Sequence, residues 1–88
     1  MPRFLAEHKL PYSTESEFLA FAKQRKPNVP KGFTWKLTYC DFSNHKFLCE
    51  WDAPSKEALA EAFKTNSVPY EAISPVKLFN AAKMRFEG

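Results

Sequence analysis

FTWKLTYCDFSNHKFLCEWD, residues 33–52, constrains the fold more than any other part of the sequence. Both of its ends are rich in aromatic and β-branched residues, which favour strands, and the four residues SNHK between them are typical of a turn. The stretch therefore predicts a β-hairpin. With the turn centred on Asn44 and His45, Cys40 lies opposite Cys49, and directly opposed residues have Cβ atoms about 4.5–5.5 Å apart. A register change of one residue would send the two thiols to opposite faces.

The segment before the hairpin predicts a strand followed by a helix. Residues 2–10 alternate loosely between apolar and polar side chains, as in a half-buried strand. Thr14 and Glu17 fit a capping box, which marks the start of a helix. The helix is expected to end near Lys26, because Pro27 disfavours helical backbone in the residue before it. The side chains that fall at helical spacing are Phe18, Phe21, Ala22 and Arg25.

The segment after the hairpin predicts a second helix and a last strand. Ser55 is expected to cap the start of the helix and Asn66 its end. Residues 67–75 contain two prolines and are expected to be irregular, and residues 76–79 are expected to form a short final strand. For the tail, residues 79–88, a short helix and an extra strand both stay open.

The predicted element order is β-α-β-β-α-β over a single domain, residues 1–88, which is the ferredoxin-like arrangement. Right-handed crossovers place both helices on one face of a four-stranded antiparallel sheet, with the first and third strands in its centre. The second face is left uncovered, although on the hairpin it carries Phe33, Trp35, Leu37, Tyr39 and Leu48. An exposed face of this kind marks an interaction surface, so we expect a homodimer with the two sheets packed face to face.

The composition excludes several classes of protein. A hydrophobic content of 44% is far from that of a disordered chain, and two glycines are too few for a phosphate-binding loop. The net charge of +3 comes from scattered lysines and arginines, which argues against a nucleic-acid partner. No apolar stretch reaches the roughly 18 residues of a membrane span, and no signal peptide is recognised. A cytoplasmic protein without a membrane partner is expected, and there cysteines are usually thiols.

His8, Cys40 and Cys49 are the candidate metal ligands. Thiolate and imidazole groups suit zinc, copper or nickel, and two opposed cysteines form a chelating pair. His8 lies on the first strand, which is expected beside the third, so its side chain approaches Cys49 if both share a face. Two alternatives stay open: the cysteines are small buried core residues, or they form a redox disulfide.

Glu7, Tyr39, Glu50 and Asp52 form a second candidate site, for a small ligand. In the assumed register Tyr39 opposes Glu50 and Leu37 opposes Asp52, so these groups share one sheet face. Carboxylates buried inside a dimer would have raised pKa values and would act as general bases or bind a small molecule. The alternative is that Asp52 only lies near a helix N-terminus and that Glu7 and Glu50 lie at a solvated edge.

Three segments together resemble one protein family: the opening MPRFLAEH with His8, the strand with Tyr39, and CEWDAP at residues 49–54. This family contains small one-domain ferredoxin-like proteins, largely of unknown function, with a nickel-binding member. The resemblance implies the fold, a dimeric α+β barrel, and nickel or another transition metal as the cofactor. Two departures weaken the implication of nickel: Asp52 replaces a glutamate, and residues 62–67 lack the histidines that many members carry.

We therefore expect a small homodimeric protein that binds a metal ion or a small molecule at or near the sheet. The alternative is a cofactor-free enzyme, such as an isomerase or a monooxygenase, with a pocket between the two sheets of the dimer, by analogy between folds. An RNA-recognition module is less favoured, because the strand HKFLCEWD is acidic and lacks the glycine of that motif.

Overall fold

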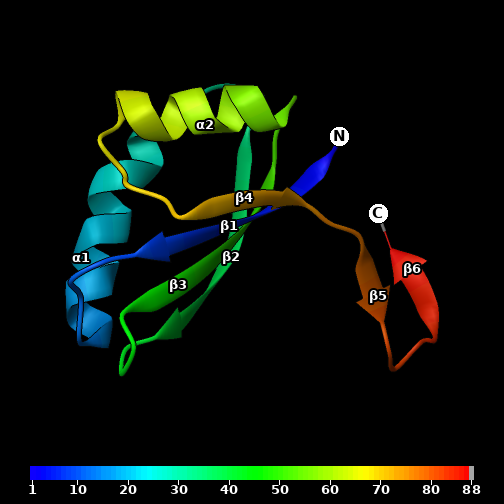
Figure 1. Ribbon diagram of the computed structural model, residues 1–88, viewed down its shortest axis with the longest axis horizontal. Helices are drawn as coiled ribbons and strands as arrows, with labels where there is room; N and C mark the ends of the chain where they lie inside the picture. Colours follow the sequence, from blue (N-terminus) through cyan, green and yellow to red (C-terminus); the bar gives the residue numbers. More distant parts are fainter. Residues whose placement is uncertain (88) are drawn as a thin grey trace.

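The computed structural model describes residues 1–87 (Figure 1). Its helices are α1 (Glu15–Arg25), the short 3₁₀ helix η1 (Lys26–Asn28) and α2 (Lys56–Thr65). Its strands are β1 (Arg3–Lys9), β2 (Thr34–Asp41), β3 (Lys46–Asp52), β4 (Ala72–Pro75), β5 (Leu78–Asn80) and β6 (Arg85–Glu87). The first four strands form an antiparallel sheet in the order β2-β3-β1-β4, while β5 and β6 pair separately. The chain is therefore α+β, and the central position of β1 and β3 is confirmed.

Local sequence signals fix where both helices begin. The Thr14 side chain accepts a hydrogen bond from the backbone N–H of Glu17, and the Glu17 carboxylate accepts one from the N–H of Thr14, which completes the capping box. The Ser55 hydroxyl accepts from the N–H of Ala58 at the start of α2. Asn66 caps the end of α2, as predicted. No helix within residues 1–87 is long and apolar enough to cross a bilayer.

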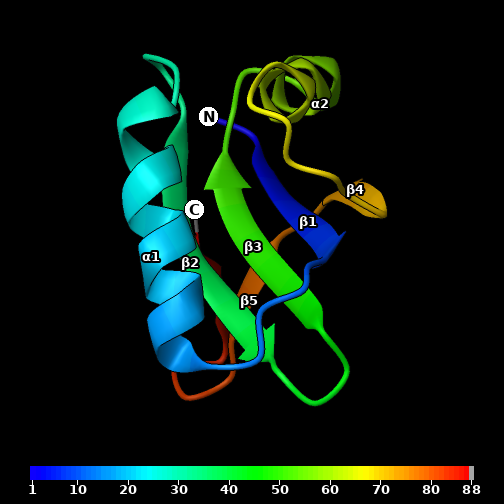
Figure 2. The ribbon, with the colours of Figure 1, turned by 90° about the vertical axis from the view of Figure 1, so that its left-hand side faces the viewer.

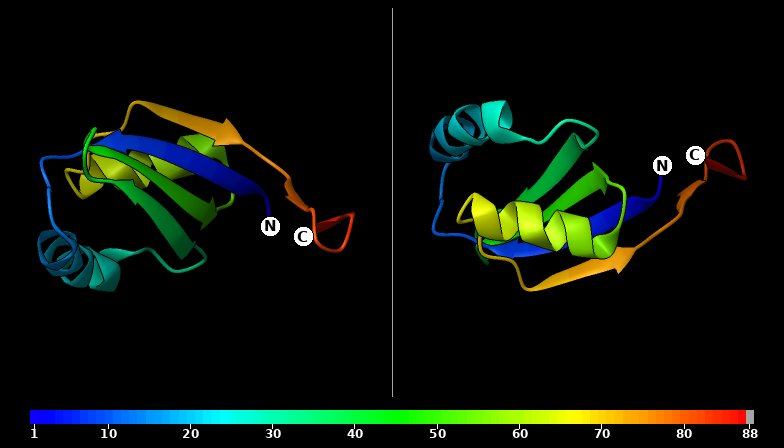
Figure 3. Two further views of the ribbon diagram at one scale, coloured as in Figure 1. Left: turned by 90° about the horizontal axis from the view of Figure 1, so that it is seen from below. Right: turned by 90° about the horizontal axis from the view of Figure 1, so that it is seen from above.

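Both helices pack on one face of the sheet, which we call the inner face (Figures 2 and 3). Phe18 of α1 stacks on Phe47, with ring centroids 5.3 Å apart, and Phe63 of α2 contacts Trp51 edge-on at 5.6 Å. The two helices differ in how they are held, because α2 buries Leu59 and Phe63 whereas no residue of α1 is buried. Helix α1 thus rests on aromatic rings and does not penetrate the core.

The hairpin forms, but its predicted register is wrong by two residues. Cys40 lies opposite Phe47, and Cys49 lies opposite Thr38, so the two cysteines share the inner face without facing each other. The cause is Asp41, whose carboxylate accepts hydrogen bonds from the backbone and side-chain amides of Asn44. This contact holds the four-residue loop at residues 42–45, one residue earlier than the predicted turn at residues 43–46.

A β-bulge in β2 corrects the predicted position of Trp35. The register shifts between Trp35 and Leu37, so Lys36 is the extra residue and Trp35 turns to the inner face. There its ring stacks on Trp51 with the centroids 5.8 Å apart. Phe33 also packs against the core, which leaves the opposite, outer face less aromatic than predicted.

The last strand of the sheet was also placed wrongly. Strand β4 lies in the segment expected to be irregular, because Ile73 fits beside Ala6 of β1 and becomes buried there. Pro75 is tolerated because β4 is an edge strand and needs hydrogen bonds on one side only. The tail forms the β5–β6 hairpin, which projects from the rest of the chain (Figure 1). An extra strand thus replaces the helical alternative, and Gly88 lies outside the described residues.

We predict that Leu59→Ala lowers the free energy of unfolding by about 2–5 kcal/mol, because Leu59 is fully buried and the substitution leaves a cavity. The matched control is Leu19→Ala on α1, where the side chain is 54% exposed and the expected change is within about 0.5 kcal/mol. Urea unfolding followed by circular dichroism measures both. Equal losses in the two variants would contradict the described core.

Candidate functional site

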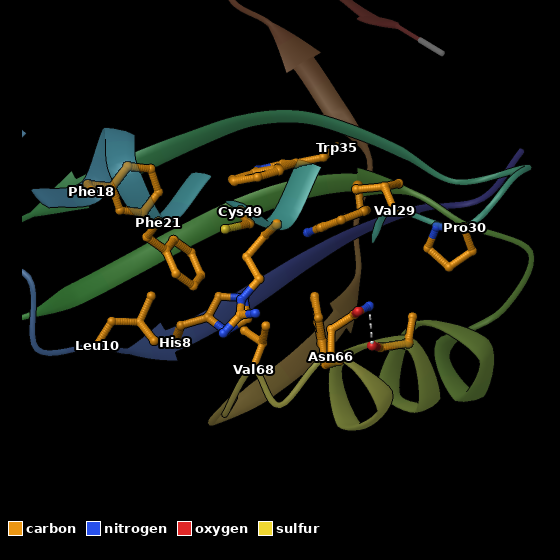
Figure 4. Close-up of a pocket in the computed structure, with 14 residues that line it drawn as sticks. His8, Leu10, Phe18, Phe21, Val29, Pro30, Trp35, Cys49, Asn66 and Val68 are labelled. Atoms are coloured by element: carbon orange, nitrogen blue, oxygen red, sulfur yellow. Dashed lines mark hydrogen bonds between the residues drawn. The ribbon is translucent and has the colours of Figure 1, made fainter. Parts of the chain in front are cut away.

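A pocket of about 40 Å³ lies between the inner face of the sheet and the two helices (Figure 4). It exists because α1 and α2 stand apart over the sheet, which Figure 2 shows with β3 and β1 visible between them. The walls are mainly apolar side chains, and those from the helices and the loops beside them are Leu10, Phe18, Phe21, Val29, Phe63 and Val68. Its lining, a concave apolar wall with a few polar groups, resembles that of a small-molecule site, but its volume is well below the roughly 300–1,000 Å³ that such sites usually have.

Two hydrogen-bond donors on the pocket wall have no partner. Trp51 is only 7% exposed, and its indole Nε1 is buried without an acceptor. The Nε of Arg25, at the end of α1, is likewise buried without an acceptor. Within residues 1–87 no carboxylate forms an ion pair with Arg25, and the guanidinium lies 5.6 Å from the ring centroid of Phe21.

His8 borders the same pocket as a neutral, buried imidazole. Its Nδ1 lies 2.7 Å from the carbonyl oxygen of Pro69, and because a carbonyl only accepts, Nδ1 carries the proton and Nε2 does not. Burial lowers the pKa of His8, and the hydrogen bond to Pro69 opposes this only in part. The ring also contacts Phe63 edge-on, with the centroids 4.9 Å apart.

Cys49 is the buried thiol of the pocket. The Thr38 hydroxyl donates a hydrogen bond to its Sγ at 3.1 Å, and the indole of Trp35 donates to the Thr38 oxygen at 2.8 Å. Burial raises the pKa of Cys49 to about 11, so the thiol is protonated near neutral pH. Burial also raises the pKa of the half-buried Cys40. Neither cysteine is a ready thiolate, and both are free.

The three candidate metal ligands lie on the inner face without converging. His8 and Cys40 are both paired with Phe47, from opposite sides, so the Phe47 ring separates them. Cys49 and His8 border one pocket, while Cys40 does not line it. The described part of the chain contains no group of three or more metal-ligating side chains close enough to hold an ion.

The second candidate cluster lies on the outer face of the sheet. Tyr39 opposes Leu48 and not Glu50, which follows from the corrected register. Every carboxylate of the cluster is in an ion pair: Glu7 with Lys46, Glu50 with Arg3 and Lys36, and Asp52 with Lys36. Tyr39 is 67% exposed. The cluster is a charged, partly apolar surface, on which Asp52 and Glu7 border two different pockets.

Arg25 and Trp51 are pocket residues that were not predicted from the sequence. A signal for Arg25 was present, because it falls at helical spacing with Phe18 and Phe21, on the stripe of α1 that faces the sheet. A charged residue on an apolar stripe is a departure from the usual pattern. No sequence signal indicated that the indole of Trp51 would lack an acceptor.

We predict that His8 makes stability depend on pH. Its pKa is lower in the folded state than in the unfolded chain, where it is about 6.5, so its contribution is complete above about pH 6.5 and is lost as the pH falls towards the folded pKa. The slope is at most about 1.4 kcal/mol per pH unit. Urea unfolding of the wild type and His8→Gln between pH 7 and pH 5 should show a steeper loss for the wild type. Parallel curves would contradict this assignment.

Two comparisons with known proteins agree with this fold. The structure of SCO4226 from Streptomyces coelicolor A3(2) superposes with a TM-score of 0.72 at 22% identity, covering 86% of this chain and 96% of that one. The search of curated proteins found no match. The model of the family described as nickel responsive protein SCO4226-like matches residues 4–76. The chain therefore belongs to the SCO4226-like family of nickel responsive proteins.

Proposed function

We propose that this protein is a homodimeric binding protein that holds a small organic molecule in the pocket between its sheet and its helices. The observation that carries the proposal is the pair of unpartnered donors, on Arg25 and Trp51, in an apolar wall. A buried donor without an acceptor costs about 1–3 kcal/mol. A ligand that supplies an acceptor removes this cost, so the free pocket is suited to bind one.

The way α1 is held supports entry of a ligand. No residue of α1 is buried, and the helix contacts the sheet through rings such as Phe18 on Phe47. Moving α1 outward separates these rings and exposes Phe47, which is fully buried, but α1 has fewer buried residues of its own than α2 and is therefore the easier helix to open. Helix α2 stays in place through Leu59 and Phe63.

A second copy of the chain is the partner that fits the outer face. Leu37 and Tyr39 are exposed on this face, and no helix covers it. The outer face carries basic and acidic side chains side by side, as in the ion pair of Arg3 with Glu50. Two copies of this face can therefore bring opposite charges together across an interface. Packing the outer faces together gives the dimeric α+β barrel.

Nickel does not fit the pocket of a single chain as its ligand. His8 and Cys49 are suitable donors, but no third donor within residues 1–87 joins them. Nickel binding through sulfur requires a thiolate, and the raised pKa of Cys49 opposes its formation. The alternative of a cofactor-free enzyme on the outer face has less support than binding, because Glu7, Glu50 and Asp52 are already in ion pairs.

The binding function predicts that small organic fragments enter the pocket. In ¹H–¹⁵N NMR spectra, at least one fragment from a panel of anionic, cationic and neutral compounds should shift the indole N–H of Trp51 in a saturable way. Ala62→Leu, which fills the pocket from α2, should abolish the shift, whereas Ala20→Leu on the exposed side of α1 should keep it. A panel without any saturable shift would contradict the proposal.

Native mass spectrometry and sedimentation test the dimer. The wild type should be dimeric, and Tyr39→Glu should dissociate it, because the substitution buries a charge in the interface. Leu19→Glu introduces the same charge on α1 and should leave the dimer intact. A monomeric wild type would contradict the dimer.

The same mass spectra also test nickel binding. If the wild type held one nickel ion per chain and Cys49→Ala lost it, the metal would be the ligand in place of an organic molecule.

A further inference from the structure

We infer that the ligand of this pocket is a short-chain monocarboxylate, whose head group is held by Arg25 and Trp51 and whose tail lies against phenylalanine rings. The inference rests on the proposed binding function and goes beyond it by naming the chemical class. Nothing in the family description specifies an organic ligand.

The charge of the pocket selects an anion. Arg25 is only partly exposed, its Nε is buried, and none of the residues that line the pocket is acidic. His8 stays neutral, so Arg25 supplies the one full charge among these lining residues. A guanidinium whose Nε is shielded from water without an acceptor is unfavourable, and its planar donors match a carboxylate. The positive charge of Arg25 also disfavours protonated amines as ligands.

The indole of Trp51 adds a second donor and no acceptor. Indole Nε1 can only donate, so it is satisfied by the oxygen of a ligand and not by another donor. It borders the same small cavity as Arg25, so one head group can contact both. Two donors and a positive charge suit the two oxygens of one carboxylate better than a hydroxyl or an amide.

The size of the cavity limits the ligand. A volume of about 40 Å³ holds about three or four groups of the size of water, since each requires roughly 10–15 Å³. Acetate, with four non-hydrogen atoms, falls in this range, and propionate, with five, exceeds it by one. The rings of Phe18, Phe21 and Phe63 line the remaining wall and suit an apolar tail. A dicarboxylate would place its second charge against these rings, which is unfavourable.

The test is an NMR titration of the Trp51 indole N–H with sodium propionate, propionamide and sodium chloride at equal ionic strength. Propionate should give a saturable shift, and propionamide and chloride should not. Arg25→Gln should weaken propionate binding by about tenfold or more, because a charge-assisted hydrogen bond is lost. Lys23→Gln removes a charge from the same helix outside the pocket and should bind as the wild type does.

A second variant keeps the test valid if Arg25→Gln is poorly folded. Trp51→Phe retains an aromatic ring but removes the N–H, and it should reduce the rise in melting temperature that propionate produces. Equal binding of propionamide would overturn the carboxylate while leaving the binding function in place. Saturable binding of chloride alone would make this an inorganic anion site and overturn the inference. No binding of any compound would overturn both proposals.

Discussion

The stack of Trp35 on Trp51 is the contact on which the rest of the inner face depends. It requires the bulge at Lys36, because a regular strand would direct Trp35 to the outer face. Once turned inward, Trp35 donates to Thr38, and Thr38 donates to Cys49, so the thiol is held in a hydrogen-bonded chain. The bulge therefore makes the pair of tryptophans a wall of the pocket and makes Cys49 a structural residue.

The pocket reflects a division of roles between the helices. Helix α2 anchors the core through Leu59 and Phe63, while α1 covers the sheet although none of its own residues is buried. The space between them leaves donors of Arg25 and Trp51 without acceptors, which is unfavourable in the free protein. The local stability of the free protein is thus lower around the pocket, where the ligand is expected to bind, than around the core of α2. This is a common feature of binding sites. Binding should both fill the cavity and tighten α1 against the sheet.

The parts of the fold set by neighbouring residues could be predicted from the sequence. Thr14 and Ser55 cap the helices through contacts three residues away, and periodicity identified β1 and the hairpin strands. The register could not be predicted, since it depends on how Asp41 holds its loop, and neither could the bulge at Lys36. Strand β4 was missed because Ile73 becomes a core residue only through its partner strand.

The candidate site was predicted only in part, for the same reason. His8 and Cys49 were singled out and do border the pocket, but their partners, a carbonyl and a hydroxyl, are ordinary groups of distant segments.

The most direct test of propionate binding in the pocket is to detect nuclear Overhauser effects between ¹³C-labelled propionate and the protein. We expect contacts to both Phe21 of α1 and Phe63 of α2. Contacts confined to Leu37 and Tyr39 would instead place the ligand on the outer face and contradict this expectation.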